Sequence, residues 1–336
     1  MRRAPYDTIL KPYGTALVEL AAERPDILCL SGDLTRQCEV DLFQEAYPDR
    51  FIHGGMAEAN MVGVAGGLAR RGFTPFVHTF GVFATRRPYD QVAMAVAYPN
   101  LPVRLVGFMP GVSSPGGPSH QAIDDVALMR ALPNMTVVDV ADATETRLAV
   151  RAIADVPGPV YLRLKRGEIP VLFDDDHEFD LGRAQVLRRS GDGGVALVAG
   201  GMMVPTAAQV CDVLEEHGVA FTLVNVPVVK PLDGETIRSV AGSSDLVVTA
   251  ENHSVVGGLG SAVAEALASD PAAPPMRAVG IGDVFASGAK SAPHLFAKYG
   301  LSTSAILATI WDGLGRTDPV PNAPRLEATE GEYAPV

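Results

Sequence analysis

Cysteine, tryptophan and positive charge are all scarce in this chain of 336 residues. It holds three cysteines and one tryptophan, and 27 Lys and Arg residues stand against 39 Asp and Glu, which gives a formal net charge of −12. Cys29, Cys38 and Cys211 lie far apart, which argues against a disulfide framework or a Cys-x-x-Cys zinc site and favours a reducing, cytoplasmic setting. The acidic balance, without a basic stripe, argues against nucleic acid or an anionic membrane as partner.

Long apolar runs are absent as well. No stretch approaches the roughly 18 apolar residues of a membrane span, and residues 1–7 lack the apolar core of a signal peptide. Apolar residues make up 47% of the chain and charged residues 20%, a globular composition. The length suits two domains of roughly 150 residues each.

Short β-branched runs alternate with segments of helical periodicity, which predicts an α/β fold. Each of two consecutive domains is expected to be a mostly parallel sheet with helices on both faces. In the first domain, we expect strands at 27–30, 74–79, 103–108, 136–140 and 159–164, and helices at 16–23, 57–71, 88–98, 121–132 and 143–154.

A polar, acidic segment at 174–178 interrupts this pattern, and a second α/β series follows between 195 and 281. We therefore predict a first domain at 1–180 and a second at 190–314. Residues 315–336, rich in Pro, Glu and Ala, are expected to form an extended tail.

Two glycine-rich segments invite assignment as phosphate sites. The Gly-Asp-Gly at 191–193 lacks the preceding apolar strand and the Asn about 25–30 residues later that a magnesium–diphosphate motif needs, so it is expected to be a turn between strands. Residues 257–261 could bind an anion at a helix N-terminus, but close packing of strand on helix is the favoured interpretation. No metal ligand is predicted on this chain.

One carboxylate stands out. Glu58 opens the helix predicted at 57–71, which is built almost entirely from small and apolar residues. Acidic residues are favoured in the first turn of a helix because of the helix dipole. The Glu58 carboxylate is expected to face either water or a buried partner that needs it.

Other polar and aromatic residues also follow predicted strands, at the edge where open α/β sheets bind ligands. His120 comes after a Gly-Pro-Ser loop and is expected in the first turn of a helix, with Ser119 as N-cap in the alternative interpretation. Phe80 and Phe83 suit a stacking wall or core packing. The Arg pairs at 86–87 and within 163–166 suit local anion sites or salt-bridged surface.

Taken together, these segments resemble the C-terminal half of transketolase, over about residues 10–312. The resemblance is carried, in order, by 55–61 (GMAEANM), 79–80 (TF), 87–91 (RPYDQ), 117–121 (GPSHQ), 128–135 (LMRALPNM), 251–254 (ENHS) and 257–260 (GGLG). It implies a pyrimidine-binding domain followed by the transketolase C-terminal domain.

The resemblance also implies thiamine diphosphate as cofactor and transfer of a two-carbon ketol unit from a ketose to an aldehyde. Glu58 matches the Glu that hydrogen-bonds the N1′ atom of the aminopyrimidine, and His120 matches a histidine that contacts the donor's hydroxyls, so both are expected to be catalytic. The implied cofactor-binding residues are Asp33, Leu34, Met56, Glu58, Phe80, Phe83 and Arg86, and the implied substrate residues are Lys11, His120 and Arg166.

The family's diphosphate-binding domain has no counterpart in these residues. The resemblance therefore implies a split enzyme, in which an N-terminal partner subunit carries that domain and binds Mg²⁺ or Ca²⁺. The family's active dimer then implies a two-plus-two heterotetramer.

Two positions depart from the family pattern. Phe108 replaces a histidine found in members that use phosphorylated ketoses, and Gly116 replaces an Asp that contacts a substrate hydroxyl. These departures predict a non-standard sugar or small carbonyl substrate.

Two other interpretations remain open. The β subunit of a 2-oxo acid dehydrogenase has the same two-domain architecture and would also use Glu58. A catalytically degenerate, structural subunit is the non-enzyme alternative, and the presence of Glu58, Phe80, Phe83 and His120 argues against it.

Overall fold

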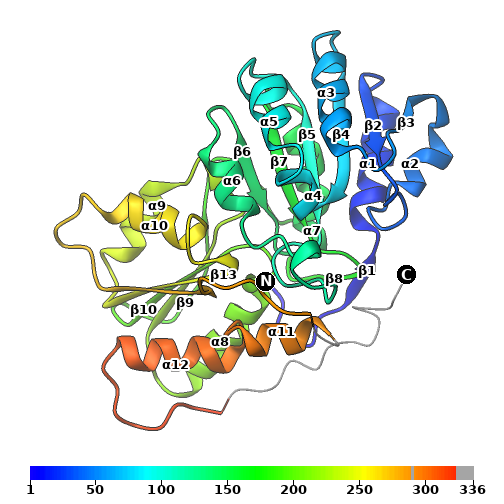
Figure 1. The fold of residues 1–336 in the computed structure, drawn as a ribbon. Coiled ribbons are helices and arrows are strands. Elements are labelled where there is room, and N and C mark those ends of the chain that lie inside the picture. Colours follow the sequence, from blue (N-terminus) through cyan, green and yellow to red (C-terminus); the bar gives the residue numbers. More distant parts are fainter. Residues whose placement is uncertain (289–290, 323–336) are drawn as a thin grey trace.

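A computed structural model describes residues 1–288 and 291–322, and it forms two α/β units that lie against each other (Figure 1). The first unit is built on a seven-stranded sheet of order β12-β6-β7-β5-β4-β2-β3, and the second on a five-stranded sheet of order β14-β13-β10-β11-β9. A two-stranded antiparallel ribbon, β1-β8, lies apart from both.

In the first unit the strands are β1 (Thr8–Leu10), β2 (Ile27–Ser31), β3 (Phe51–His53), β4 (Thr74–Phe80), β5 (Arg104–Phe108), β6 (Thr136–Asp139), β7 (Val160–Leu164) and β8 (Glu168–Pro170). Its helices are α1 (Pro12–Glu23), α2 (Asp41–Ala46), α3 (Glu58–Ala69), α4 (Gly81–Thr85), α5 (Tyr89–Gln91), α6 (Asp125–Ala131) and α7 (Ala143–Ala154).

In the second unit the strands are β9 (Gln185–Arg189), β10 (Val195–Ala199), β11 (Phe221–Asn225), β13 (Leu246–Ser254) and β14 (Met276–Ile281), and β12 (Val228–Lys230), between β11 and β13 in the sequence, belongs to the sheet of the first unit. Its helices are α8 (Met203–Glu216), α9 (Gly234–Ala241), α10 (Leu259–Leu267), α11 (Ala292–Lys298) and α12 (Thr303–Gly313).

The central strands of both sheets run parallel, as the alternating sequence pattern predicts. Every residue of β2, β4, β5, β7, β10 and β11 is buried. Strands covered by helices on both faces need such continuous apolar runs. The predicted two-domain α/β fold is therefore confirmed.

The chain returns to the first unit and leaves it again, which makes two crossings more than the sequence pattern predicts. Strand β12 follows β11 in sequence, but it pairs antiparallel with β6 and so completes the edge of the first sheet. A three-residue strand gives too short a pattern to reveal this crossing from sequence.

Two helix predictions are wrong. The helix expected at 121–132 begins only at Asp125, because Ala122 bridges to Pro110 and Gly111 and is held extended. His120 consequently ends a 3₁₀ turn, Pro118–His120, rather than opening a helix.

Other boundaries also differ from the sequence pattern. The segment expected as one helix at 88–98 is α5 followed by a π-helix, Val92–Ala97. Residues 191–194 form the turn between β9 and β10 that the sequence predicts. Most of the tail predicted at 315–336 lies outside the described residues.

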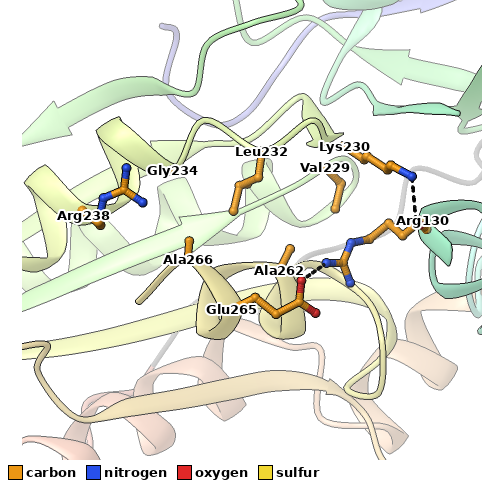
Figure 2. Close-up of a pocket in the computed structure, with 9 residues that line it drawn as sticks. All are labelled: Arg130, Val229, Lys230, Leu232, Gly234, Arg238, Ala262, Glu265 and Ala266. Atoms are coloured by element: carbon orange, nitrogen blue, oxygen red, sulfur yellow. Dashed lines mark hydrogen bonds and ion pairs between the residues drawn. The ribbon is translucent and has the colours of Figure 1, made fainter. Parts of the chain in front are cut away.

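A pocket of about 470 Å³ lies where α6 meets β12, α9 and α10 (Figure 2). Arg130 joins the two units here, and Lys230 holds β12 on the end of α6. The Lys230 ammonium donates to the carbonyls of Arg130 and Leu132, at 2.9 and 2.5 Å, and Arg130 bonds Glu265 at 2.7 Å and the Gly257 carbonyl at 2.7 Å. This hollow is thus part of the domain junction.

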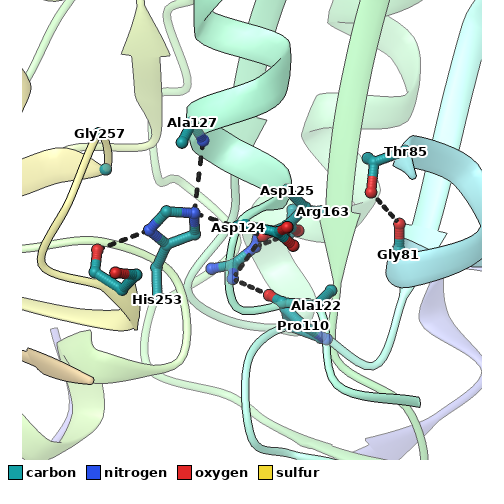
Figure 3. Close-up of polar contacts among 12 residues, drawn as sticks. Gly81, Thr85, Pro110, Ala122, Asp124, Asp125, Ala127, Arg163, His253 and Gly257 are labelled. Carbon is teal, nitrogen blue, oxygen red and sulfur yellow. Dashed lines mark hydrogen bonds and ion pairs between the residues drawn. The ribbon is translucent and has the colours of Figure 1, made fainter. Parts of the chain in front are cut away.

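A buried ionic network forms the centre of that junction (Figure 3). Arg163 is 2% exposed, and its guanidinium gives Asp125 two hydrogen bonds, at 2.8 and 3.1 Å, and Asp139 one at 3.0 Å. It also donates to the Asn252 carbonyl on β13, at 2.7 Å. The surface position considered for the 163–166 pair is therefore wrong for Arg163.

Arg163 gives Asp125 two hydrogen bonds and Asp139 one, and the pKa values of the two acids are shifted in opposite directions. Burial raises the pKa of Asp125, but Arg163 and His253 outweigh burial and hold that pKa below its usual value. Burial keeps the pKa of Asp139 above its usual value despite Arg163.

The second unit also shapes a loop of the first. The Asn252 side chain, 1% exposed, accepts a hydrogen bond from the Val112 amide and donates one to the Pro110 carbonyl, both at 3.0 Å. Between them, Gly111 has a φ of +55° and faces Asn252 so closely that any Cβ would collide with it. Asn252 therefore fixes the start of the loop that leads to His120.

The N-terminus of α1 is capped from a distant segment. No side chain of its own N-cap residue, Lys11, caps it; instead the Glu39 carboxylate accepts a hydrogen bond from the Gly14 amide at 3.0 Å. Gly14 is required, because a Cβ there would overlap the Glu39 carbonyl. Glu39 is 4% exposed, and burial raises its pKa to about 7.

Asn252→Ala removes both side-chain hydrogen bonds to the 110–112 segment and leaves a buried amide and a buried carbonyl without a partner. Each such group costs about 1–3 kcal/mol, so we expect a loss of about 2–4 kcal/mol in the free energy of unfolding, measured by urea denaturation. Asn60→Ala, at an exposed position of α3, is the control and should change the value by less than about 0.5 kcal/mol. If the two substitutions lowered the free energy of unfolding equally, the role of Asn252 in fixing the 110–112 segment would be contradicted.

Glu39→Gln tests the buried cap through pH. The folded pKa of Glu39 lies above the ordinary 4.5, so folding favours the protonated acid, and the wild type loses stability as pH rises from about 4.5 through 7. The Gln variant cannot ionise. Thermal unfolding at pH 5 and pH 8 should show the wild type falling relative to the variant, by about 3 kcal/mol. If the difference in stability between the wild type and the variant were the same at pH 5 and pH 8, the raised pKa of the buried Glu39 would be contradicted.

Candidate active site

The predicted site residues gather at one edge of the first sheet. Parallel strands β2, β3, β4, β5 and β7 all end there, and the following segments carry them. The residues in order of strand are Asp33 and Leu34 after β2, Met56 and Glu58 after β3, Phe80, Phe83 and Arg86 at and after β4, His120 after β5, and Arg166 after β7. This carboxyl edge is where open α/β sheets bind ligands.

Glu58 is the first residue of α3 and is 8% exposed. Its Oε1 atom accepts a hydrogen bond from the Arg87 guanidinium at 2.7 Å. Among the described residues, its Oε2 atom has no hydrogen-bond partner. In the chain by itself, the Glu58 carboxylate is thus paired with a half-exposed side chain of the same chain.

Phe80, Phe83 and His120 form an aromatic wall beside that carboxylate. The two phenyl rings are stacked, with centroids 6.0 Å apart and planes at 22°. The His120 ring meets Phe83 edge-on at 5.2 Å. The Arg87 guanidinium carbon lies 3.9 Å from the Phe83 centroid, so Arg87 links Phe83 to Glu58.

Arg86 is turned away from Glu58. Its guanidinium bonds both carboxylate oxygens of Asp124 at 2.9 Å and reaches the carbonyls of Pro118 and Gln121 at 3.4 Å. Arg86 therefore fastens the end of α4 to the segment that carries His120. The cofactor contact expected for it stays a prediction.

The segments after β2 and β3 lie side by side. A Cβ on Gly32 would come within 2.8 Å of the Gly55 carbonyl, so the segment with Asp33 and Leu34 adjoins the approach to Glu58. Asp33 is exposed and Leu34 half-buried against the core. Met56 is 76% exposed, which is unusual for a large apolar side chain.

Lys11 and Arg166 both lie near the segment 38–41. The Lys11 ammonium pairs with Asp41 at 2.6 Å. Burial raises the pKa of the Cys38 thiol and Glu39 raises it further, while the charge of Arg166 opposes both. The structure therefore brings these two predicted substrate cations to one part of the edge.

The two departures from the family pattern differ in position. Phe108 is fully buried and packs edge-on against Tyr13, at 5.6 Å, so it belongs to the core. Gly116 is exposed beside His120, where a Cβ would lie 3.2 Å from that residue's Cβ atom. Only Gly116 directly alters the surroundings of His120.

The cluster suits a flat, nitrogen-containing aromatic ring. Phe80 and Phe83 provide a stacking surface, and the buried Glu58 carboxylate can accept an N–H hydrogen bond. Both features fit the aminopyrimidine of thiamine diphosphate, the cofactor that the resemblance implies. The segment with Asp33 and Leu34 adjoins Gly55, which is followed in the chain by Met56 and Glu58.

Two contributors could not be assigned a role from sequence. Arg87 carries the same charge as its neighbour Arg86, and only the structure shows that it faces Glu58. Asn252 acts from the second unit, about 140 residues further along the chain, through a contact that only tertiary structure creates.

Neither a metal centre nor a membrane span is found in the described part of the chain. Residues 1–288 and 291–322 contain no group of three or more His, Cys, Asp or Glu side chains placed to hold a metal ion. Within the same ranges, no helix is both long and apolar enough to cross a membrane.

Comparison with protein-family models identifies both units. The transketolase pyrimidine-binding domain matches residues 8–171, and the transketolase C-terminal domain matches residues 182–306.

Individual relatives are similar over nearly their whole length. A putative transketolase family protein of Sinorhizobium fredii is 42% identical over 90% of this chain and 88% of its own. A 6-deoxy-6-sulfo-D-fructose transketolase subunit of Clostridium sp. is 40% identical over 88% of this chain and 91% of its own. These relatives favour transketolase over the 2-oxo acid dehydrogenase alternative.

A solved structure agrees with them. The inactive β4 tetramer of a split-gene transketolase is 41% identical, with a TM-score of 0.83, and the match covers 92% of this chain and 98% of that one. The chain therefore belongs to the transketolase family, as a C-terminal subunit of the split type.

Proposed function

We propose that this subunit and an N-terminal partner together transfer a two-carbon ketol unit from a ketose donor to an aldehyde acceptor. The observation that carries the proposal is the contact group of Glu58, Phe83 and His120, which combines a buried carboxylate, a stacking ring and a polar ring. When bound, thiamine diphosphate supplies the nucleophilic carbon of this chemistry.

Glu58 would hold the aminopyrimidine at its ring nitrogen and share a proton with it. The small and apolar residues of α3 would keep water away from the shared proton. Phe80 and Phe83 would orient the ring through stacking.

His120 would contact the donor's hydroxyl groups. Its Nδ1 atom lies 2.9 Å from the Ser119 hydroxyl, and its Nε2 atom has no hydrogen-bond partner among the described residues. Since Arg86 and Asn252 hold the two ends of the segment 110–124, the histidine is positioned from both units. Fixed geometry of this kind is what substrate orientation requires.

The substrate would carry an anionic group and differ from an ordinary pentose phosphate. Lys11 and Arg166 offer two cations at the same edge, which suits a phosphate or a sulfonate. Gly116, beside His120, lacks the carboxylate that in other family members contacts a substrate hydroxyl. The sulfo-sugar named for one relative is consistent with such a substrate.

The partner subunit would supply the diphosphate-binding domain and its Mg²⁺ or Ca²⁺ ion. A cofactor that spans two chains needs both, so the active assembly is proposed as two copies of each subunit. The tetramer formed by one relative's β chains supports self-association of this type of subunit.

Glu58→Gln tests the proposal directly. The amide keeps the shape of the side chain but cannot exchange a proton with the ring, so ketol transfer by the assembled enzyme should fall by roughly 10²-fold or more. The measurement is aldose formation from a ketose donor, by the complex with its N-terminal partner.

Glu235→Gln is the matched control, because Glu235 also lies in the first turn of a helix but is exposed in the second unit. It should leave the rate unchanged. Full activity of the Glu58→Gln enzyme would contradict the catalytic role and favour a structural subunit. In the same assay, turnover of xylulose 5-phosphate with ribose 5-phosphate at the level of a pentose-phosphate transketolase would contradict the altered substrate.

A further inference from the structure

Arg87 covers both surfaces that the proposed cofactor ring needs. One of its guanidinium nitrogens lies 2.7 Å from Glu58 Oε1, and its central carbon lies 3.9 Å from the centroid of Phe83. The carboxylate and the aromatic face are thus occupied by one side chain from the turn after α4.

A guanidinium imitates the recognition chemistry of an aminopyrimidine. Both are flat and delocalised, both stack on an aromatic face, and both can donate an N–H hydrogen bond to a carboxylate. We propose that Arg87 is a further residue of the cofactor site, whose guanidinium stands in for the aminopyrimidine until the cofactor arrives and displaces it. This inference rests on the proposed function, because it assigns Glu58 and Phe83 to that ring.

The burial of Glu58 explains why a stand-in is needed. A carboxylate that is 8% exposed loses most of its hydration, and an unpaired charge in such a place is strongly destabilising. Arg87 provides the compensating charge within the chain. The site can therefore form before the partner subunit binds.

The exposure of Arg87 explains why the stand-in can leave. Its side chain is 52% exposed, whereas that of Glu58 is 9% exposed, so the cation loses little when it moves into water. The adjacent Arg86 is fixed on Asp124 by two contacts of 2.9 Å, which anchors the backbone at this turn. Displacement therefore requires only rotation of the long Arg87 side chain.

The proposal has a direct consequence for affinity. Breaking the Glu58–Arg87 contact opposes cofactor binding, so a variant without the guanidinium should bind more tightly. We expect Arg87→Ala to lower the dissociation constant of thiamine diphosphate for the complete complex by about tenfold. Arg87→Lys keeps the charge but loses the flat group, and its value should lie between those of the wild type and the Ala variant.

The experiment is titration calorimetry of thiamine diphosphate, with magnesium, into complexes of the partner subunit with the wild-type, Arg87→Ala, Arg87→Lys or Arg70→Ala chain. Arg70 is an exposed arginine at the end of α3, and its replacement should leave the dissociation constant unchanged. Circular dichroism and thermal unfolding check that each complex is folded. If the complex with the Arg87→Ala chain does not fold, the dissociation constant of the Arg87→Lys complex is compared with that of the wild type instead.

Each outcome has one meaning. Tighter cofactor binding by the two Arg87 variants, with no change in the Arg70→Ala complex, supports the proposed displacement of Arg87 by the cofactor. Unchanged or weaker binding overturns it, and weaker binding would mean that Arg87 helps to hold the bound cofactor. If the wild-type complex binds no thiamine diphosphate, the proposed function fails and this inference fails with it; if the wild type binds and the variants do not differ, only the inference fails.

Discussion

The Arg163 guanidinium is the group on which the rest of the structure depends. It is 2% exposed and contacts α6 through Asp125, β6 through Asp139 and β13 through the Asn252 carbonyl. Removing one member of such a buried ionic network leaves an uncompensated charge, at a cost of about 3–5 kcal/mol. Arg163 therefore ties together both units and, through Asp125, the end of the loop between β5 and α6.

This arrangement explains how a domain without predicted catalytic residues can matter to the site. Asn252 belongs to the second unit, yet it fixes the backbone around Gly111, and Arg86 fixes the other end of the same segment on Asp124. His120 lies between these two attachments. The second unit thus positions the segment that carries His120, while Glu58, Phe80 and Phe83 of the first unit form the surface proposed for the cofactor ring.

Much of this could be predicted from sequence, and the failures have physical causes. Buried parallel strands need continuous apolar runs, so β2, β4, β5 and β7 were recognisable within one or two residues. Because the carboxyl ends of these strands share one edge, the loops carrying Glu58, Phe80 and His120 could be expected together. Helix α6 was predicted too long, because the bridge that keeps Ala122 extended is a tertiary contact.

The same limit applies to single side chains. Arg86 and Arg87 are adjacent and equally charged, but Arg86 bonds Asp124 and Arg87 bonds Glu58. Arg163 was considered a surface or anion-binding residue, because sequence does not reveal the two acids that make its burial possible. Strand β12 carries too few residues to signal that it joins the sheet of the other unit.

The central claim is that this chain contributes half of a thiamine diphosphate site, which becomes functional only when another subunit supplies the diphosphate and metal end. The most direct test is calorimetric titration of thiamine diphosphate with magnesium into this chain, into its N-terminal partner and into the mixture of both. The account predicts tight binding by the mixture and none by this chain alone. Tight binding by the isolated chain would contradict it.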